Sequence, residues 1–262
     1  MEFGICNLSV IPVRSDPYEQ SEMITQVLFG ELLLVEEKHK KWCRIKLVED
    51  GYEGWISKLQ YKEIPETTFK ILANSSPAIC YELVQLLINK SDNLLIPIII
   101  GSSLPGLKDG SFSINETTFN FLGEVKISEN IKPESIRDEI VSTAKLYLNS
   151  PYLWGGKTPF GIDCSGFTQI IYKINGIHIQ RDSSQQASQG ETINFLSEAR
   201  KGDLVYFDNE EGEIIHTGIL IDDNQIIHAS GKVRIDQIDH EGIYNHSLGS
   251  YTHKLRLIKK LL

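Results

Sequence analysis

The chain has 262 residues, of which 41% are hydrophobic and 23% charged, a composition typical of a soluble globular protein. Its 26 lysines and arginines face 35 aspartates and glutamates, so the formal net charge is −9. This balance argues against nucleic-acid or membrane-surface partners, because both require an excess of positive side chains. The longest apolar run, Leu94 to Ile100, is too short to span a bilayer, and the first residues lack the features of a secretory signal. We therefore expect a cytoplasmic protein.

The first sixty residues have the pattern of a small β-barrel, with short apolar runs separated by polar turns. The expected strands are Val10 to Arg14, Gln26 to Leu28, Leu32 to Glu36, Trp42 to Val48 and Tyr52 to Ile56. The ending Gly51-Tyr52-Glu53-Gly54-Trp55-Ile56 resembles that of a bacterial SH3 (SH3b) domain. Residues 1–62 are therefore interpreted as an SH3b domain, with another small β-barrel as the alternative.

Two further regions follow this barrel. Residues 63–128 carry short apolar runs separated by Ser, Asn, Gly and Pro, which predicts a second β-rich unit; a degenerate copy of the first is one interpretation. Ile136, Ile140, Ala144 and Tyr147 then recur at helical spacing, with Pro133 suited to the first turn of that helix. A third domain is expected over residues 129–262.

Cys164 stands at the predicted start of a helix. Its N-cap is Asp163, and the apolar residues that follow share one helical face: Phe167, Ile170, Ile171 and Ile174. Free backbone N–H groups and the helix dipole favour a thiolate at such a position, so we expect the pKa of Cys164 to be lowered. A buried cysteine that opens a helix is the structural alternative.

Two histidines, His216 and His228, stand on the two strands of a predicted hairpin. A three-residue loop over residues 222–224 would pair Ile221 with Gln225 and Gly218 with His228. His216 and His228 would then share one face as diagonal neighbours, roughly 7–8 Å apart. One imidazole could act as a base near a thiol and the other could orient it.

Together, Asp163-Cys164-Ser165-Gly166-Phe167, His216-Thr217-Gly218-Ile219 and Ile227-His228-Ala229-Ser230 resemble the NlpC/p60 cysteine peptidases. The resemblance covers about the last 130 residues. It implies an α+β, papain-like fold in which the nucleophile helix packs on an antiparallel sheet. It also implies Cys164 as nucleophile, His216 as general base, His228 as orienting residue and Tyr152 as an oxyanion donor.

The SH3b domain, with Tyr152-Leu153-Trp154-Gly155-Gly156 and Arg181-Asp182-Ser183, narrows the resemblance to γ-D-glutamyl-L-diamino acid endopeptidases. These cut murein peptides between D-Glu and the diamino acid, which is meso-diaminopimelate or L-Lys. Some of them act in the cytoplasm on recycled peptides, require a free N-terminal L-Ala and release L-Ala-D-Glu. The resemblance implies five substrate contacts in the catalytic domain: Trp154, Asp163, Ser165, Asp182 and Ser183. Asp182 suits the substrate ammonium, although a helix cap is equally consistent. Tyr52 and Glu22 are candidates for an SH3b wall at the substrate's amino end.

Three alternatives remain open at this point. Cys164, His216 and His228 match zinc ligands by type, although neither a metal nor a cofactor is expected. An acyltransferase or amidase on the same fold would use the same three residues. A wall-peptide-binding module without catalysis is the third. The sequence leaves open the oligomeric state and the choice between diaminopimelate and L-Lys.

Overall fold

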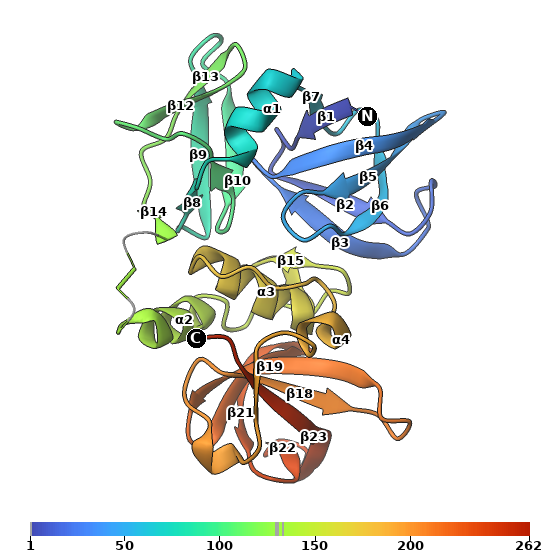
Figure 1. The fold of residues 1–262 in the computed structure, drawn as a ribbon, viewed down its shortest axis with the longest axis vertical. Helices are drawn as coiled ribbons and strands as arrows, with labels where there is room; N and C mark the ends of the chain where they lie inside the picture. The colour runs from blue at the N-terminus through green and yellow to red at the C-terminus, as the bar shows by residue number, and fades with distance from the viewer. Residues whose placement is uncertain (1, 129–130, 133) are drawn as a thin grey trace. The chain divides into compact units, whose positions relative to one another are not determined.

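The computed structural model describes residues 2–128, 131–132 and 134–262, which form two compact units divided after residue 130 (Figure 1). The expected domain start at residue 129 and the expected helix-opening Pro133 lie outside the described residues. The catalytic motifs all fall in the second unit.

The first unit begins with a seven-stranded antiparallel sheet of SH3-like barrel type, in the order β3-β2-β6-β5-β4-β1-β7. Alternating apolar residues such as Ile11, Val13 and Ile45 fill its interior, as the period of two along a strand requires. β2 has the predicted bounds, whereas β1 and β7 were not predicted. The strands are β1 (Glu2–Ile5), β2 (Val10–Arg14), β3 (Met23–Leu28), β4 (Leu32–His39), β5 (Trp42–Leu47), β6 (Glu53–Ser57) and β7 (Lys62–Glu63).

The rest of the first unit consists mainly of short strands in two small sheets, β10-β9-β13-β12 and β11-β8-β14. Ile5 and Phe29 of the barrel join Leu87, Ile98 and Phe119 in one hydrophobic core, so the two segments pack as one unit. The division at residue 63 stays an interpretation of the sequence. The elements are α1 (Glu66–Ala73), β8 (Ala78–Cys80), β9 (Val84–Asn89), β10 (Leu95–Ile99), β11 (Ser103–Leu104), β12 (Ser111–Ile114), β13 (Thr117–Asn120) and β14 (Val125–Lys126).

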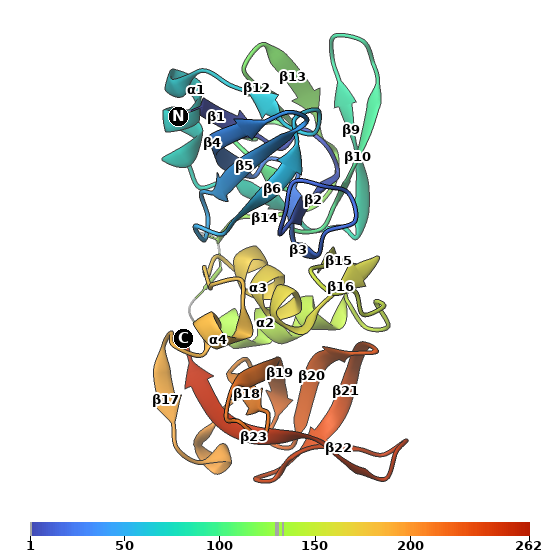
Figure 2. The ribbon, with the colours of Figure 1, turned by 90° about the vertical axis from the view of Figure 1, so that its right-hand side faces the viewer.

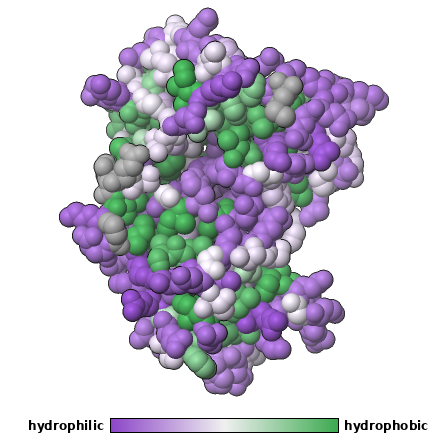
Figure 3. All heavy atoms as spheres, viewed as in Figure 1, coloured by the Kyte–Doolittle hydropathy of each residue, from purple (hydrophilic) through white to green (hydrophobic). Residues whose placement is uncertain are grey.

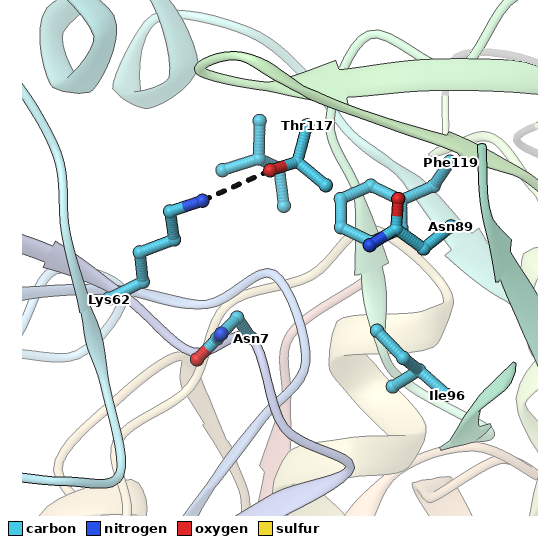
Figure 4. Close-up of a pocket in the computed structure, with 7 residues that line it drawn as sticks. Asn7, Lys62, Asn89, Ile96, Thr117 and Phe119 are labelled. Carbon is cyan, nitrogen blue, oxygen red and sulfur yellow. Dashed lines mark hydrogen bonds between the residues drawn. The ribbon is translucent and has the colours of Figure 1, made fainter. Parts of the chain in front are cut away.

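A pocket of about 150 Å³ opens in the first unit between the barrel and the second segment. Lys62 of β7 donates a hydrogen bond to Thr117 of β13 at 3.1 Å (Figure 4). Asn7, Asn89 and Ile96 also line it. The pocket contains none of the residues predicted for catalysis.

The second unit is α+β and papain-like, with helices packed on an antiparallel sheet. Figure 2 shows α2 and α3 on one side of that sheet. The sheet order is β17-β23-β18-β19-β20-β21-β22, and β22 also pairs with β23, so strands β18 to β23 close into a ring. The helices are α2 (Ile136–Lys145), α3 (Cys164–Ile174), α4 (Ser183–Gln186) and the short 3₁₀ helix η2 (Leu196–Glu198). The strands are β15 (Lys157–Thr158), β16 (Gly161–Ile162), β17 (Glu191–Ile193), β18 (Leu204–Asp208), β19 (Ile214–Asp222), β20 (Gln225–Ser230), β21 (Lys232–Ile238), β22 (Gly242–Asn245) and β23 (Ser250–Lys260).

Helix α3 is the central element of this unit, and every one of its residues is buried. Its apolar side chains pack toward β19 and β20, the strands that carry the two predicted histidines. A rigid, buried helix fixes the residue at its start better than a loop would.

Hydrophilic and hydrophobic residues are interspersed over the face seen in Figure 3. Among the described residues, none of the helices has the length and apolar character needed to cross a membrane.

Candidate active site

The start of α3 is fixed by Asp163, as predicted. The Asp163 carboxylate accepts a hydrogen bond from the Gly166 N–H at 2.6 Å, which satisfies one of the free donors of the first turn. It also accepts from the Gly155 N–H at 2.8 Å and ties the preceding loop to the helix. Cys164 is therefore held in the first turn of α3.

The β19–β20 hairpin places His216 and His228 on one face, although its loop differs from the prediction. Asp222 rather than Ile221 pairs with Gln225, so the turn has two residues, and the predicted three-residue loop was wrong. A bulge between Leu220 and Asp222 adds one residue to β19 and restores the register. The predicted pairing of Gly218 with His228 is confirmed.

The two imidazoles are in direct contact. His216 Nε2 lies 2.8 Å from His228 Nδ1, a hydrogen bond between two buried rings. His228 Nε2 in turn lies 3.0 Å from Oδ2 of Asp236, a buried residue of β21. His228 is thus held between His216 and Asp236, so the site contains three hydrogen-bonded side chains rather than the predicted pair of histidines.

Burial sets the charge state of these groups. It raises the pKa of Cys164 to about 12, an effect increased by the Asp163 carboxylate and opposed by backbone hydrogen bonds with Thr217 and Ser165. Burial also holds the pKa of His216 well below its ordinary value. The expected lowering of the thiol pKa was therefore wrong, because desolvation outweighs the helix terminus. The thiol and the imidazole are both neutral in the resting site.

Tyr152 lies beside the start of α3. It forms a parallel bridge with Ile162, and its N–H donates to the Gly231 carbonyl at 3.0 Å. Burial raises the pKa of its phenol to about 12, and the charge of the Asp163 carboxylate acts in the same direction. The phenol is therefore protonated at neutral pH, and its hydroxyl could donate a hydrogen bond to an oxyanion.

The predicted substrate contacts of the second unit fall into two groups. Trp154 is 60% exposed and presents its indole at the surface. Asp163 and Ser165 are buried, and both are bound by Arg181, whose Nη2 lies 2.6 Å from Asp163 Oδ2 and whose Nη1 lies 2.8 Å from Ser165 Oγ. Their side chains thus build the site, and direct contact with substrate stays a prediction.

Asp182 and Ser183 open helix α4. Asp182 is its N-cap and forms a capping box with Gln185, so the helix-cap interpretation is confirmed. Ser183 is the first residue of that helix and is half-buried. Its N-cap role does not exclude a second partner, so binding of the substrate ammonium by Asp182 stays a prediction.

The two SH3b candidates belong to the first unit. Tyr52 is half-buried and packs on the barrel core, and Glu22 is exposed just before β3. Their contact with a substrate in the second unit stays a prediction.

Three residues of the second unit were missed by sequence reasoning. Asp236 binds His228, His253 stacks on His216 with ring centroids 4.1 Å apart, and Arg181 binds Asp163. For Asp236 a signal existed: Arg234 pairs with His228, so Asp236, two residues on, shares the face of His228. His253 comes from the distant strand β23 and carried no comparable signal.

The zinc alternative does not fit this geometry. Both ring nitrogens of His228 are engaged, one by His216 and the other by Asp236, so neither nitrogen is directed at a metal. Within residues 2–128, 131–132 and 134–262, no group of three or more His, Cys, Asp or Glu residues is arranged to hold a metal ion.

Comparison with known proteins finds two family models that match parts of the chain. A model of the NlpC/P60 family matches residues 149–252, and a model of the "Bacterial dipeptidyl-peptidase Sh3 domain" matches residues 13–60. A γ-D-glutamyl-L-lysine dipeptidyl-peptidase of Bacillus cereus is 30% identical over 80% of this chain and 68% of its own length. The Bacillus subtilis protein of the same name is 29% identical over 78% of this chain and 71% of its own length.

A solved structure of an NlpC/P60 family protein from Bacillus cereus has the same fold, with a TM-score of 0.81 and 22% identity. It covers 98% of this chain, and this chain covers 99% of it. The extent of these matches and the cysteine–histidine site lead to one conclusion: the chain belongs to the NlpC/P60 family and is a cysteine peptidase.

Proposed function

We propose that this peptidase hydrolyses the bond between γ-D-Glu and the diamino acid of murein peptides that carry a free N-terminal L-Ala, and that it releases L-Ala-D-Glu. The observation that carries the proposal is the hydrogen-bonded His216–His228 pair on β19 and β20, the strands on which the Cys164 helix packs. The chain also matches γ-D-glutamyl-L-lysine dipeptidyl-peptidases over most of its length. An intact site argues against a binding module without catalysis.

The chemistry follows from the protonation state of the site. The Cys164 sulfur attacks the γ-carbonyl carbon of D-Glu while its proton passes to the His216 ring nitrogen that is not bonded to His228. Tyr152 and a backbone N–H stabilise the oxyanion. His216 then returns the proton to the leaving amine as the C–N bond breaks, and water hydrolyses the thioester. Cys164 and His216 therefore stay neutral, and do not form a thiolate–imidazolium pair, before the substrate is bound.

Dipeptide release requires a site that is closed at the substrate's amino end. We assign the substrate ammonium to Asp182, the anionic N-cap of α4, because an anion in a partly closed pocket favours a charged amine. Trp154, Asp163, Ser165 and Ser183 complete the contacts in the second unit. Tyr52 and Glu22 are assigned to the wall that limits the dipeptide.

The same proposal places this activity in the recycling of released wall peptides in the cytoplasm. A dipeptidyl-peptidase that needs a free amino terminus acts on short soluble peptides rather than on intact wall. Fractionation of cells that express the tagged chain tests this part separately, and recovery of the protein outside the cytoplasm would contradict it.

The activity test is a mass-spectrometric assay with L-Ala-γ-D-Glu-meso-diaminopimelate, its L-Lys counterpart and the same peptides acetylated on alanine. We expect L-Ala-D-Glu from the free peptides only. Cys164→Ala should abolish it, whereas Cys43→Ala, which removes a buried thiol of the barrel core, should retain it. Equal cleavage of the acetylated peptides would discard the closed amino end but keep the peptidase.

Transfer is distinguished from hydrolysis in the same assay. Adding a second amine at millimolar concentration would yield an amide of L-Ala-D-Glu if the enzyme were an acyltransferase. We expect the free acid as the main product. Failure to cleave any of the four peptides, with Cys164 still reactive toward iodoacetamide, would refute the proposed substrate.

A further inference from the structure

We propose that Asp236 is a positioning residue that fixes the tautomers of His228 and His216, so that Nδ1 of His216, the nitrogen not bonded to His228, is free to accept the thiol proton. The inference rests on the cysteine peptidase reaction and not on the identity of the substrate. It concerns the far end of the hydrogen-bonded chain, where Asp236 Oδ2 meets His228 Nε2 at 3.0 Å.

Asp236 acts as an acceptor only. It is buried, and Arg234 holds it, with Nη2 donating to Oδ1 at 2.8 Å and Nε lying 2.7 Å from Oδ2. Burial acts to raise the pKa of Asp236, but the hydrogen bonds from His228 and Arg234 outweigh it and hold that pKa below its ordinary value. Since an ionised carboxylate has no proton to give, His228 Nε2 must be the donor.

This direction is transmitted through His228 to His216. Burial lowers the pKa of His228, so the ring is neutral and carries one proton, on Nε2. Its Nδ1 is then an acceptor, and the 2.8 Å contact requires His216 Nε2 to be the donor. His216 is also neutral, so its single proton lies on Nε2 and its Nδ1 keeps a lone pair.

The consequence for catalysis is specific. Only a bare Nδ1 on His216 can take the proton of Cys164, and the opposite tautomer would present an N–H to the thiol. In serine peptidases, loss of the correct tautomer of the base lowers kcat by about 10⁴-fold. Here the carboxylate acts through one intervening ring, so we expect a loss of about 10²- to 10³-fold when no acceptor replaces it.

Two substitutions separate the acceptor from the charge. Asp236→Leu has the same branching at Cγ, a larger volume and no acceptor, so it should lower kcat by about 10²- to 10³-fold with little change in KM. Asp236→Asn keeps a carbonyl oxygen. Nitrogen atoms of both His228 and Arg234 face the Oδ2 position, so the side-chain amide should place its oxygen there and not its NH₂ group. This variant should keep kcat within about tenfold of the wild type, because the acceptor is retained. Asp223→Asn, in the exposed β19–β20 turn, is the control for charge.

The tautomers are read directly by ¹⁵N NMR of histidine-labelled protein. We expect protonated Nε2 and bare Nδ1 on both rings of the wild type and of Asp236→Asn, and a mixed or reversed pattern in Asp236→Leu. Iodoacetamide should alkylate Cys164 more slowly in Asp236→Leu. These two measurements use no peptide, so they test the inference even if the proposed substrate is wrong.

Several results would overturn the inference. A proton on His228 Nδ1 in the wild type would do so, and this measurement decides the matter if Asp236→Leu does not fold. Activity of Asp236→Leu within threefold of the wild type, with an unchanged melting temperature, would also refute it. If Asp236→Asn lost as much activity as Asp236→Leu, the charge and not the tautomer would be the contribution of Asp236.

Discussion

The rings of His216 and His253 stack, with centroids 4.1 Å apart and planes inclined by 25°. Phe207 packs on the same base, its centroid 5.7 Å from that of His216. Burial lowers the pKa of His253 to about 4. His253 is therefore neutral at neutral pH, and the proton that His216 accepts during the reaction meets no positive neighbour there.

His253 should make the folded protein less stable in mild acid. Its folded pKa of about 4 lies below the unfolded value of 6.5, so the unfolded chain takes up the proton first as the pH falls. Stability is lost between pH 6.5 and 4, at most at about 1.4 kcal/mol per pH unit for one proton. His253→Phe keeps the stack without the titration, so its melting temperature should fall less between pH 7 and 5. His240→Phe, at an exposed site, is the control, and equal pH dependence of all three proteins would contradict the argument.

The neutral state of Cys164 predicts how its alkylation depends on pH. With a pKa raised to about 12 by burial, the thiolate fraction increases about tenfold per pH unit below that value. The rate of iodoacetamide modification of Cys164 should therefore rise steadily from pH 6 to 9. Peptide mapping by mass spectrometry separates it from Cys6, Cys43 and Cys80, which are also buried. A rate that is flat over this range would indicate a thiolate–imidazolium pair instead.

Tyr152→Phe tests the oxyanion donor. The substitution removes one hydroxyl near the thiol and keeps the ring, so it should lower kcat by about 10²- to 10³-fold and leave KM nearly unchanged. Tyr251→Phe, which removes a hydroxyl bonded to Asp239, is the matched control and should leave kcat unchanged. A rise in KM at constant kcat would assign Tyr152 to substrate binding.

Local patterns were sufficient to predict much of the catalytic unit. The N-cap Asp163, the helix after Cys164 and the pairing of Gly218 with His228 all follow from short-range signals. The loop was predicted wrongly because a two-residue turn and a bulge at Ile221 produce the same register as a three-residue loop. Alternation of side chains along the strands fixes the face of each histidine but does not show which of these solutions the backbone adopts.

The residues that surround the histidines could not be predicted in the same way. Arg181 reaches Asp163 across 18 positions of the sequence, and His253 reaches His216 from β23. Such contacts depend on how separate elements pack, and periodicity within one element does not record this. The wrong direction for the pKa of Cys164 has the same origin, because the extent of burial is a tertiary property.

Arg181 should be essential for stability around α3. Its guanidinium and Asp163 form a buried pair, and removal of one partner leaves the other charge uncompensated. Arg181→Met should lower the free energy of local unfolding of α3 by about 3–5 kcal/mol. Hydrogen exchange of the α3 amides, read by mass spectrometry, measures this. Arg200→Met, at an exposed site, should have little effect, and equal protection of α3 in both variants would contradict the role of the pair.

Gly218 should be required for the position of His228. An alanine Cβ at this site would lie 2.8 Å from His228 Cβ and 2.8 Å from Ile226 Cδ1, closer than carbon atoms approach. The strand must shift, and the 2.8 Å contact of His228 with His216 is lost or lengthened. Gly218→Ala should lower kcat by about 10²-fold, the order expected for a 1 Å misplacement in a catalytic group, and cost about 1–3 kcal/mol of stability.

A control must separate this effect from simple destabilisation. Ile258→Val removes one methylene from the core of the same sheet and should cost about 0.5–1.5 kcal/mol while leaving kcat unchanged. ¹⁵N NMR of Gly218→Ala should show the His228 and His216 resonances displaced, because their shared hydrogen bond reports on the distance between the rings. A kcat of Gly218→Ala within twofold of the wild type would show that the sheet accommodates the methyl group without moving His228. In that case the close packing of Gly218 against His228 does not position the imidazole ring.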